Sequence, residues 1–167
     1  EIPEKIDSFL INQSAIRKKT MIMKTHFVKY FMWNIKDVSI NNSNHKYLAD
    51  LKSATLSFNG NPLISEAPGS FYNELNRYMK FNSSTSLIRN SDGSINDSSL
   101  NPVYNYSFSM TPMLNKLSGF LTTEKFNDVA FEFDIKESTI TSRQVNLYLV
   151  KHNIIRINDG NLNILYN

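Results

Sequence analysis

Apolar and polar residues alternate with a period of two along most of this 167-residue chain, and this pattern predicts half-buried antiparallel strands. The alternation is clearest in residues 54–58, 103–110 and 128–135. One face of each strand is expected to contribute to a core, while the other face carries smaller or polar side chains. The side chains expected to face the core are Ala54, Leu56 and Phe58, then Tyr104, Tyr106, Phe108 and Met110, and finally Val129, Phe131, Phe133 and Ile135.

Two further stretches, residues 27–35 and 145–157, are apolar on both faces. In the first of them, Phe31 and Trp33 oppose Tyr30 on the other side of the strand. A strand in a simple two-layer sandwich needs only one apolar face. The second apolar face therefore predicts cover by a loop, a neighbouring domain or another subunit, because a large exposed apolar patch favours aggregation.

One helix is expected over residues 70–81, directly after Pro68 and Gly69, with Ser70 as its N-cap. An apolar stripe along the helix is expected to face the core. This stripe consists of Phe71, Leu75, Tyr78 and Met79, and the residues outside it are Glu74, Asn76, Arg77 and Lys80.

Two dipeptides, Asn59-Gly60 and Asp159-Gly160, end strands in tight turns, since glycine tolerates the positive φ that a two-residue turn requires. Residues 82–101 are rich in Ser, Asn and Asp, and they are expected to form a long polar surface loop inserted between strands. Few helices and many short strands indicate a β-sandwich or a jelly roll. The strands are expected near residues 8–13, 20–24, 27–36, 51–58, 103–110, 117–123, 128–135 and 144–150, followed by a hairpin over 154–166.

Length and composition indicate one globular domain with a sizeable core, since 41% of the residues are hydrophobic. The absence of Cys excludes disulfides and thiolate chemistry. The net charge of +3 is spread along the chain, with its densest basic run at Arg17-Lys18-Lys19, so no specific nucleic-acid partner is expected. No uncharged apolar stretch approaches the length of a membrane span. The chain begins at Glu1 without a signal-peptide pattern, and we expect a fragment or a processed product.

The sequence contains no recognisable catalytic or metal-binding motif. The three histidines, His26, His45 and His152, lack metal-ligand spacing, and the five dispersed glycines form no phosphate loop. Glu132 and Asp134 are the best candidates for a catalytic carboxylate pair, but a solvated strand face explains them better. We therefore expect no enzyme activity, catalytic residue, cofactor or metal.

Four stretches carry motifs that occur together, in this order, in one protein family. Residues 26–33 read HFVKYFMW, with Phe27 where the family usually has proline, and residues 54–60 end in Asn-Gly before the expected helix. Residues 106–112 read YSFSMTP and lead to Leu117-Ser118-Gly119, and residues 151–160 read KHNIIRINDG. Together they resemble the second jelly roll of the double-jelly-roll major capsid proteins of nucleocytoplasmic large DNA viruses and their virophage relatives. The proline that usually precedes Ser118 is absent, and residues 121–127 depart from the family pattern.

The resemblance implies an all-β, eight-stranded antiparallel jelly-roll sandwich with one short helix and the long polar insertion loop 82–101. Residues 1–167 would form a single jelly-roll domain, the C-terminal half of a double-jelly-roll protein. The implied function is that of a structural viral major capsid protein subunit, which forms trimeric pseudo-hexagonal capsomers of an icosahedral shell. The side chains expected in the core or at an interface are Phe27, Phe31, Trp33, Tyr104, Tyr106 and Phe108.

The resemblance also implies partners and a location. The partners are the other copies in a homotrimer, the neighbouring capsomers, the N-terminal jelly roll of the same protein and minor capsid proteins. The location is the virion, after assembly in the host cytoplasm or nucleus. Two alternatives stay open: a related viral assembly scaffold, or a carbohydrate- or protein-binding β-sandwich that uses Trp33 or the 82–101 loop as its contact.

Overall fold

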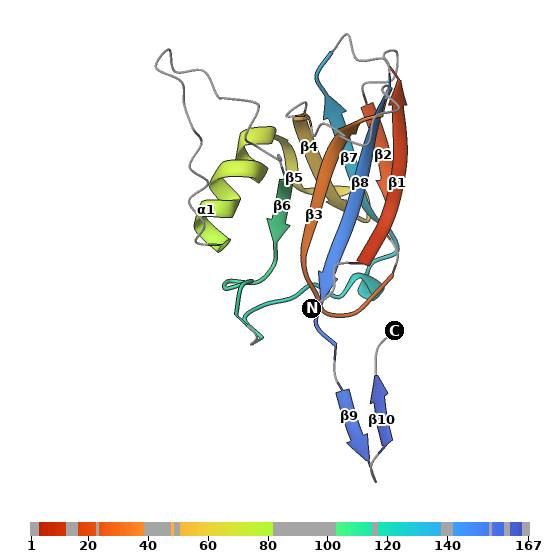
Figure 1. Ribbon diagram of the computed structural model, residues 1–167, viewed down its shortest axis with the longest axis vertical. Helices are drawn as coiled ribbons and strands as arrows, with labels where there is room; N and C mark the ends of the chain where they lie inside the picture. The colour runs from red at the N-terminus through yellow and green to blue at the C-terminus, as the bar shows by residue number, and fades with distance from the viewer. Residues whose placement is uncertain are drawn as a thin grey trace.

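The computed structural model describes residues 4–12, 17–22, 24–38, 48, 51–81, 103–114, 117–137, 142–153, 155–158 and 161–164. Two antiparallel four-stranded sheets pack face to face in these residues (Figure 1). The first sheet has the order β1 (Glu4–Asn12), β8 (Ser142–Lys151), β3 (Val28–Asp37) and β6 (Val103–Ser107). The second sheet has the order β2 (Arg17–Met21), β7 (Val129–Ile135), β4 (Leu51–Phe58) and β5 (Asn61–Pro68).

The order of the strands is that of a jelly roll. Apart from the β4–β5 hairpin, each strand from β1 to β8 lies in the other sheet from the strand before it. All the pairings between neighbouring strands are antiparallel. The predicted all-β, eight-stranded jelly-roll sandwich with one short helix is therefore confirmed.

The core lies between the two sheets and is centred on Trp33 of β3, which is fully buried. Four aromatic rings surround the indole, with centroids no more than 5.9 Å away, and each such pair contributes about 0.5–1.5 kcal/mol beyond the burial of its surface. The predicted core-facing residues of 54–58 and 128–135 belong to this core or pack against it, so these two predictions are confirmed. The four rings belong to Tyr72, Tyr104, Phe131 and Phe133.

Strand β6 ends at Ser107, three residues before the predicted end of its strand. The N–H groups of Phe108 and Ser109 both donate to the carbonyl oxygen of Lys29, which breaks the regular ladder. The Ser107 hydroxyl exchanges two hydrogen bonds with the backbone of Ser109, and such local bonds compete with sheet pairing. The prediction that Met110 faces the core is wrong, because it lies beyond the strand and is 67% exposed.

The strand predicted near residues 117–123 is wrong. Leu121 forms a single bridge to Val28, and Thr123–Lys125 form one 3-10 turn. Strand β5 completes the second sheet instead. Apolar and polar residues do not alternate along β5, because it is an exposed edge strand with shifts in its register. Its prolines, Pro62 and Pro68, are tolerated there because an edge strand has one side without a pairing partner.

The turn at Asn59 and Gly60 joins β4 to β5, as the Asn-Gly pair predicts. The two residues have φ values of 51° and 78°, the left-handed pair that a two-residue hairpin turn requires. The side-chain oxygen of Asn59 also accepts hydrogen bonds from the backbone N–H groups of Asn127 (2.8 Å) and Asp128 (3.1 Å). The turn is thereby attached to the start of β7.

The helical segment covers the predicted residues but presents a different face. A π-helical turn, Phe71–Leu75, precedes α1, Asn76–Phe81. Of the predicted inward stripe, only Phe71 packs against the core. Leu75, Tyr78 and Met79 are exposed, and the buried side chains are Tyr72 and Asn76. A π turn hydrogen-bonds one residue further along than an α turn, so the positions that follow it depart from the regular helical period.

Ser70 does not cap the helix. Its backbone is already helical, with φ −62° and ψ −32°, and its side chain makes no capping hydrogen bond. The predicted N-cap is therefore wrong, because a cap residue needs an extended backbone to turn its side chain towards the first free N–H groups.

A C-terminal hairpin, β9 (Ile155–Asn158) and β10 (Asn161–Ile164), extends away from the sandwich (Figure 1). It lies within the hairpin predicted over residues 154–166. Its predicted turn at Asp159-Gly160 and the predicted loop 82–101 lie outside the described residues. Within the described part of the chain, no helix is long and apolar enough to cross a membrane.

The segment after β6 turns back on itself through Ser118 and Gly119. The hydroxyl groups of Ser109 and Ser118 lie 2.6 Å apart and share a hydrogen bond, and Thr111 donates to the Ser118 hydroxyl oxygen through its N–H and its own hydroxyl. Gly119 has a φ of 128°, and a Cβ atom there would lie 2.5 Å from the carbonyl oxygen of Phe108. The turn therefore requires glycine for two reasons, its backbone conformation and the lack of space.

We predict that Gly119→Ala destabilises the protein much more than Gly60→Ala. Both glycines have positive φ, but a Cβ at Gly60 would meet no atom within 4 Å. The free energy of unfolding should fall by about 1 kcal/mol for Gly60→Ala, from backbone strain, and by about 3 kcal/mol for Gly119→Ala, from strain and the clash together. Urea denaturation of both variants measures this, and equal losses would show that the close approach to Phe108 does not matter.

Candidate interaction surface

Five of the six aromatic residues predicted in the core or at an interface lie in or against the core, whereas the ring of Phe27 contacts Phe120 outside it. Phe31, Trp33 and Tyr104 are buried between the sheets. The other three are half-buried, and Phe27 has a φ of 52°, which proline, usual here in the resembling family, is unable to adopt. A role at an interface stays a prediction for all six. The half-buried residues are Phe27, Tyr106 and Phe108.

The outer face of the first sheet is polar around Asn146 of β8. Three hydrogen bonds of 2.9–3.1 Å connect side chains across β1, β8 and β3, and the central Asn146 is only 3% exposed. Asn146 accepts from Ser8 and donates to Asn34, while Gln144 donates to Ser8. These side chains satisfy one another along this part of the sheet.

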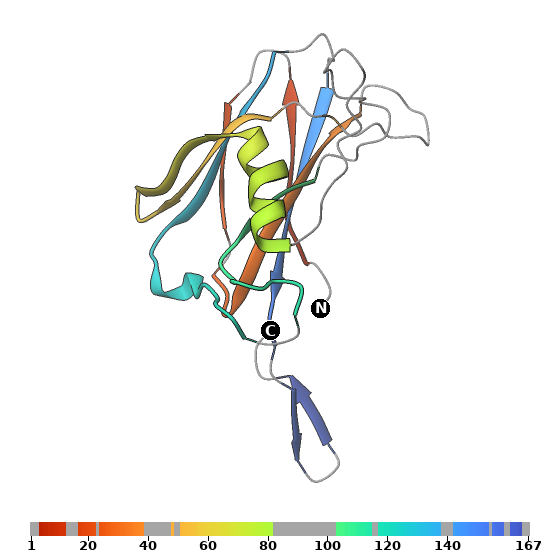
Figure 2. The ribbon, with the colours of Figure 1, turned by 90° about the vertical axis from the view of Figure 1, so that its left-hand side faces the viewer.

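Towards β6 the same outer face carries apolar side chains, and the helical segment lies against this edge of the sheet (Figure 2). The ring of Tyr30 on β3 meets the ring of Phe81 on α1, with centroids 5.1 Å apart. The Asn76 amide donates to the Asn105 carbonyl oxygen on β6 (2.8 Å). The cover expected for the second apolar face of β3 therefore comes in part from the chain's own helix.

Tyr72 anchors the helical segment to the second sheet. Its hydroxyl donates to the carbonyl oxygen of Ala54 (2.8 Å), and the side chain is fully buried. Burial, with a smaller contribution from nearby Tyr106, raises the pKa of Tyr72 well above its usual value, and burial also raises the pKa of Tyr106. Both phenols stay neutral across the physiological range.

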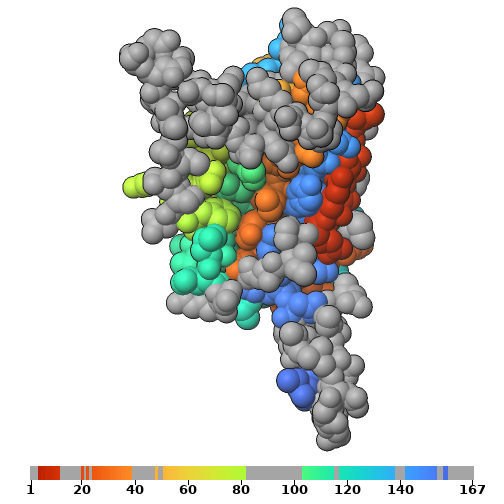
Figure 3. Space-filling view, in the orientation of Figure 1, coloured from red at the N-terminus to blue at the C-terminus, as the bar shows by residue number. Residues whose placement is uncertain are grey.

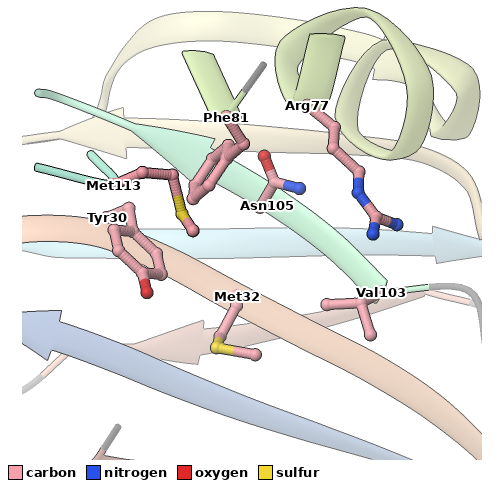
Figure 4. A pocket seen from close by; sticks show the side chains of 7 residues that line it. All are labelled: Tyr30, Met32, Arg77, Phe81, Val103, Asn105 and Met113. Carbon is pink, nitrogen blue, oxygen red and sulfur yellow. The ribbon is translucent and has the colours of Figure 1, made fainter. Parts of the chain in front are cut away.

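A pocket of about 450 Å³ opens between α1, β3, β6 and the segment after β6. Figure 4 shows the Asn105 amide between the helix residues Phe81 and Arg77 and the β3 residues Tyr30 and Met32. Asn105 is 6% exposed, and its side-chain oxygen has no hydrogen-bond partner. The pocket is thus mainly apolar and contains a buried, unsatisfied acceptor. Its remaining lining residues are Val103 and Met113.

Large apolar side chains are exposed on two neighbouring segments, the helical segment and the segment after β6, and we call them together the helix-flank surface. The atoms of α1 and of the residues that follow β6 lie next to one another there (Figure 3). Sequence reasoning missed this surface, because Leu75, Tyr78, Met79 and Met110 were expected to face the core and a strand was expected near residues 117–123. The surface consists of Leu75, Tyr78 and Met79 on the helical segment and Met110, Met113, Leu114, Leu117 and Phe120 on the segment after β6.

The described histidines and carboxylates considered as candidates for catalysis or metal binding take part in separate contacts. The His26 imidazole lies 2.9 Å from the carboxylate of Glu124 in a partly exposed pair. The solvated strand face expected for Glu132 and Asp134 is wrong for Asp134, which is buried and whose carboxylate lies 3.3 Å from the ammonium group of Lys52. In the part of the chain that the structure describes, no group of three or more His, Asp or Glu residues could hold a metal ion. His45 lies outside that part.

Comparison of the fold with solved structures finds viral capsid proteins. The chain is similar to the PBCV-1 virus capsid (TM-score 0.68) and to the crystal structure of PBCV-1 VP54 fitted into a cryo-EM reconstruction of the virophage Sputnik (TM-score 0.65). Each is 16% identical in sequence, and each match covers 100% of this chain and 52% of the other. The Faustovirus major capsid protein also matches, with a TM-score of 0.54 and 9% identity over 87% of this chain and 33% of the other.

The likeness to large-virus and virophage-related capsid proteins, predicted from four motifs, is therefore confirmed at the level of the fold. The chain spans about half the length of the PBCV-1 chains that it matches. No protein-family model matches the sequence, and no curated protein sequence matches it significantly.

We predict that Tyr72→Phe lowers stability at neutral pH and weakens its dependence on alkaline pH. Loss of the hydrogen bond to Ala54 should cost about 1 kcal/mol. The pKa of Tyr72 is higher in the folded than in the unfolded state. The contribution of this phenol to the free energy of unfolding is therefore complete below pH about 10 and is lost as the pH rises towards the pKa of the folded state. Tyr72→Phe removes that loss.

Urea denaturation between neutral and strongly alkaline pH measures this difference. Tyr78→Phe is the matched control, because the Tyr78 side chain is 69% exposed, and it should follow the wild-type curve. Wild type and Tyr72→Phe differing by the same amount at every pH would contradict the prediction.

Proposed function

We propose that this chain is a structural jelly roll of a viral major capsid protein and carries out no catalysis. The observation that carries the proposal is the fold match over the whole chain, which corresponds to about half of a PBCV-1 capsid chain. The jelly-roll order of the strands supports it, because viral capsid domains are among the proteins built on this two-sheet architecture.

The finer assignment follows the four sequence motifs. The chain would be the C-terminal roll of a double-jelly-roll polypeptide, with an N-terminal roll beside it. Three such polypeptides would form a trimeric, pseudo-hexagonal capsomer of an icosahedral DNA-virus shell. Neighbouring capsomers and minor capsid proteins would be its further partners, the virion its location, and residues 82–101 a surface loop.

A jelly roll of this kind acts through shape and contact rather than chemistry. Its two sheets form a rigid body around a core of closely packed aromatic rings. Obligate interfaces between such bodies bury ~2,000 Å² or more and resemble a core divided in two. The exposed apolar side chains of the helix-flank surface are the kind of residue that such interfaces bury.

A carbohydrate-binding sandwich that stacks sugars on Trp33 is disfavoured. The indole is fully buried within four aromatic rings and offers no face to a ligand. An assembly scaffold with the same fold remains the alternative, and the location of the protein distinguishes the two.

We predict that an antibody raised against this chain detects a major component of purified virus particles. The detected polypeptide should have about twice the mass of this chain, since the chain corresponds to 52% of the PBCV-1 capsid chain. Denaturing electrophoresis and quantitative mass spectrometry of the particles measure its size and copy number. The particle-free fraction of the same infected cells is the control.

Two results would contradict the proposal. A protein abundant in infected cells but absent from purified particles would instead be an assembly scaffold. A band at the mass of the single roll would refute the double-jelly-roll assignment while leaving a capsid role in place.

A further inference from the structure

We propose that the helix-flank surface binds a second copy of this chain, and that the pocket beside it receives a hydrogen-bond-donating side chain from that copy. The inference rests on the proposed capsid function and names the surface through which that function operates. Four observations support it: the location of the exposed apolar side chains, their total area, the charged residues beside them, and the unsatisfied acceptor in the pocket.

The exposed apolar side chains are concentrated on the helical segment and the segment after β6. Among the described residues, eleven large apolar side chains are exposed, and eight of them belong to the helix-flank surface. The other three, Leu10, Leu63 and Ile157, are single residues on β1, β5 and β9. Single exposed apolar residues are ordinary on soluble proteins, whereas a concentration of eight marks an interaction site.

The two parts of the surface are held together. The Lys80 ammonium group lies 3.5 Å from the Met110 sulfur, which connects α1 to the segment after β6. Fully buried Lys29 donates to the carbonyl oxygen of Leu114 (3.1 Å), and Met110 donates to the carbonyl oxygen of Ser118 (2.9 Å). The segment therefore has a defined position beside the helix.

The area of the surface suits a protein partner. With about 150–250 Å² for a fully exposed large side chain, the exposed fractions of the eight residues correspond to roughly 900 Å². A standard protein–protein interface buries about 800 Å² on each partner. The surface is thus large enough for a specific contact with one other protein molecule.

The border of the surface suits a copy of the same chain. Glu74 lies in the first turn of the helical segment and Lys80 in its last turn. Because both signs of charge stand beside the same apolar area, a second copy can oppose its Lys80 to Glu74 of the first. Opposite charges arranged in this way help to orient two partners.

The pocket adds a specific requirement. The Asn105 side-chain oxygen is an acceptor without a donor, and Met113 belongs both to the pocket lining and to the helix-flank surface. A buried polar group without a partner lowers stability, so its presence is explained if a partner supplies the donor. An aromatic side chain with an O–H or N–H fits the apolar walls and this acceptor, and such residues dominate the energy of protein interfaces.

The first experiment measures self-association of the purified 167-residue chain by sedimentation equilibrium. The wild type should associate reversibly, and Met79→Glu should weaken the association by about tenfold or more, because it places a charge in the apolar contact. Leu63→Glu is the matched control: its side chain is also exposed but lies on β5, and it should associate as the wild type does. Circular dichroism checks that each variant is folded.

A wild type that is monomeric at all concentrations would overturn the inference, as would Met79→Glu associating like the wild type. Equal weakening by Leu63→Glu would also overturn it. None of these results bears on whether the protein is found in virus particles, so failure of this surface and failure of the proposed capsid function are distinguishable.

The second experiment tests the pocket with Asn105→Leu. Removing an unsatisfied buried acceptor should raise the Tm of the chain, measured at concentrations where it is monomeric, by about 3 °C. The same change should weaken self-association by about tenfold, because the donor of the partner loses its acceptor. If Asn105→Leu raises the Tm but leaves self-association unchanged or tighter, the pocket does not receive a donor from the second copy. A fall in the Tm would also refute this role.

Discussion

Strand β3 is apolar on both faces, and the rest of the structure depends on covering both. The inner face is covered by the second sheet, where Trp33 is enclosed by four aromatic rings. The outer face is beyond the reach of that sheet, because a two-layer sandwich covers each of its sheets on one side only. The helical segment between β5 and β6 covers part of this outer face, with Phe81 against Tyr30.

Polar groups decide how that helix lies on the sandwich. The Tyr72 hydroxyl and the Asn76 amide each donate to a backbone carbonyl oxygen of a strand, and both side chains are buried. Buried donors and acceptors need partners, so these two contacts select one face of the helix. The consequence is that Leu75, Tyr78 and Met79 point outward. Covering one apolar surface thus creates another on the outside of the helix.

This arrangement connects the fold to the proposed self-association. A jelly roll at 16% sequence identity to a capsid chain keeps its architecture because the pattern of core positions, rather than the individual side chains, defines the sheets. The helix-flank surface has a different origin, since it lies on the helix and on the irregular segment after β6. Such connecting segments are where proteins with one scaffold differ in the partners that they bind.

The regular strands were predictable wherever the period of two was clear. Residues 54–58 and 128–135 faced the core as expected, and the Asn59-Gly60 turn followed from the left-handed backbone that this pair favours. Strand β5 was not predictable, because an exposed edge strand buries little and carries no alternation. The strand expected near residues 117–123 failed because Gly119 turns the chain away from regular pairing.

By itself, the sequence determined the fold class, the strands that form the core and the fact that β3 needs cover on two sides. Only the tertiary structure decided what provides that cover, which face of the helix is buried and where the exposed apolar residues gather. The physical reason is that alternation is a local property of the backbone, encoded residue by residue. The pairing of buried polar groups such as Asn76 and Asn105 depends on segments that meet only after folding.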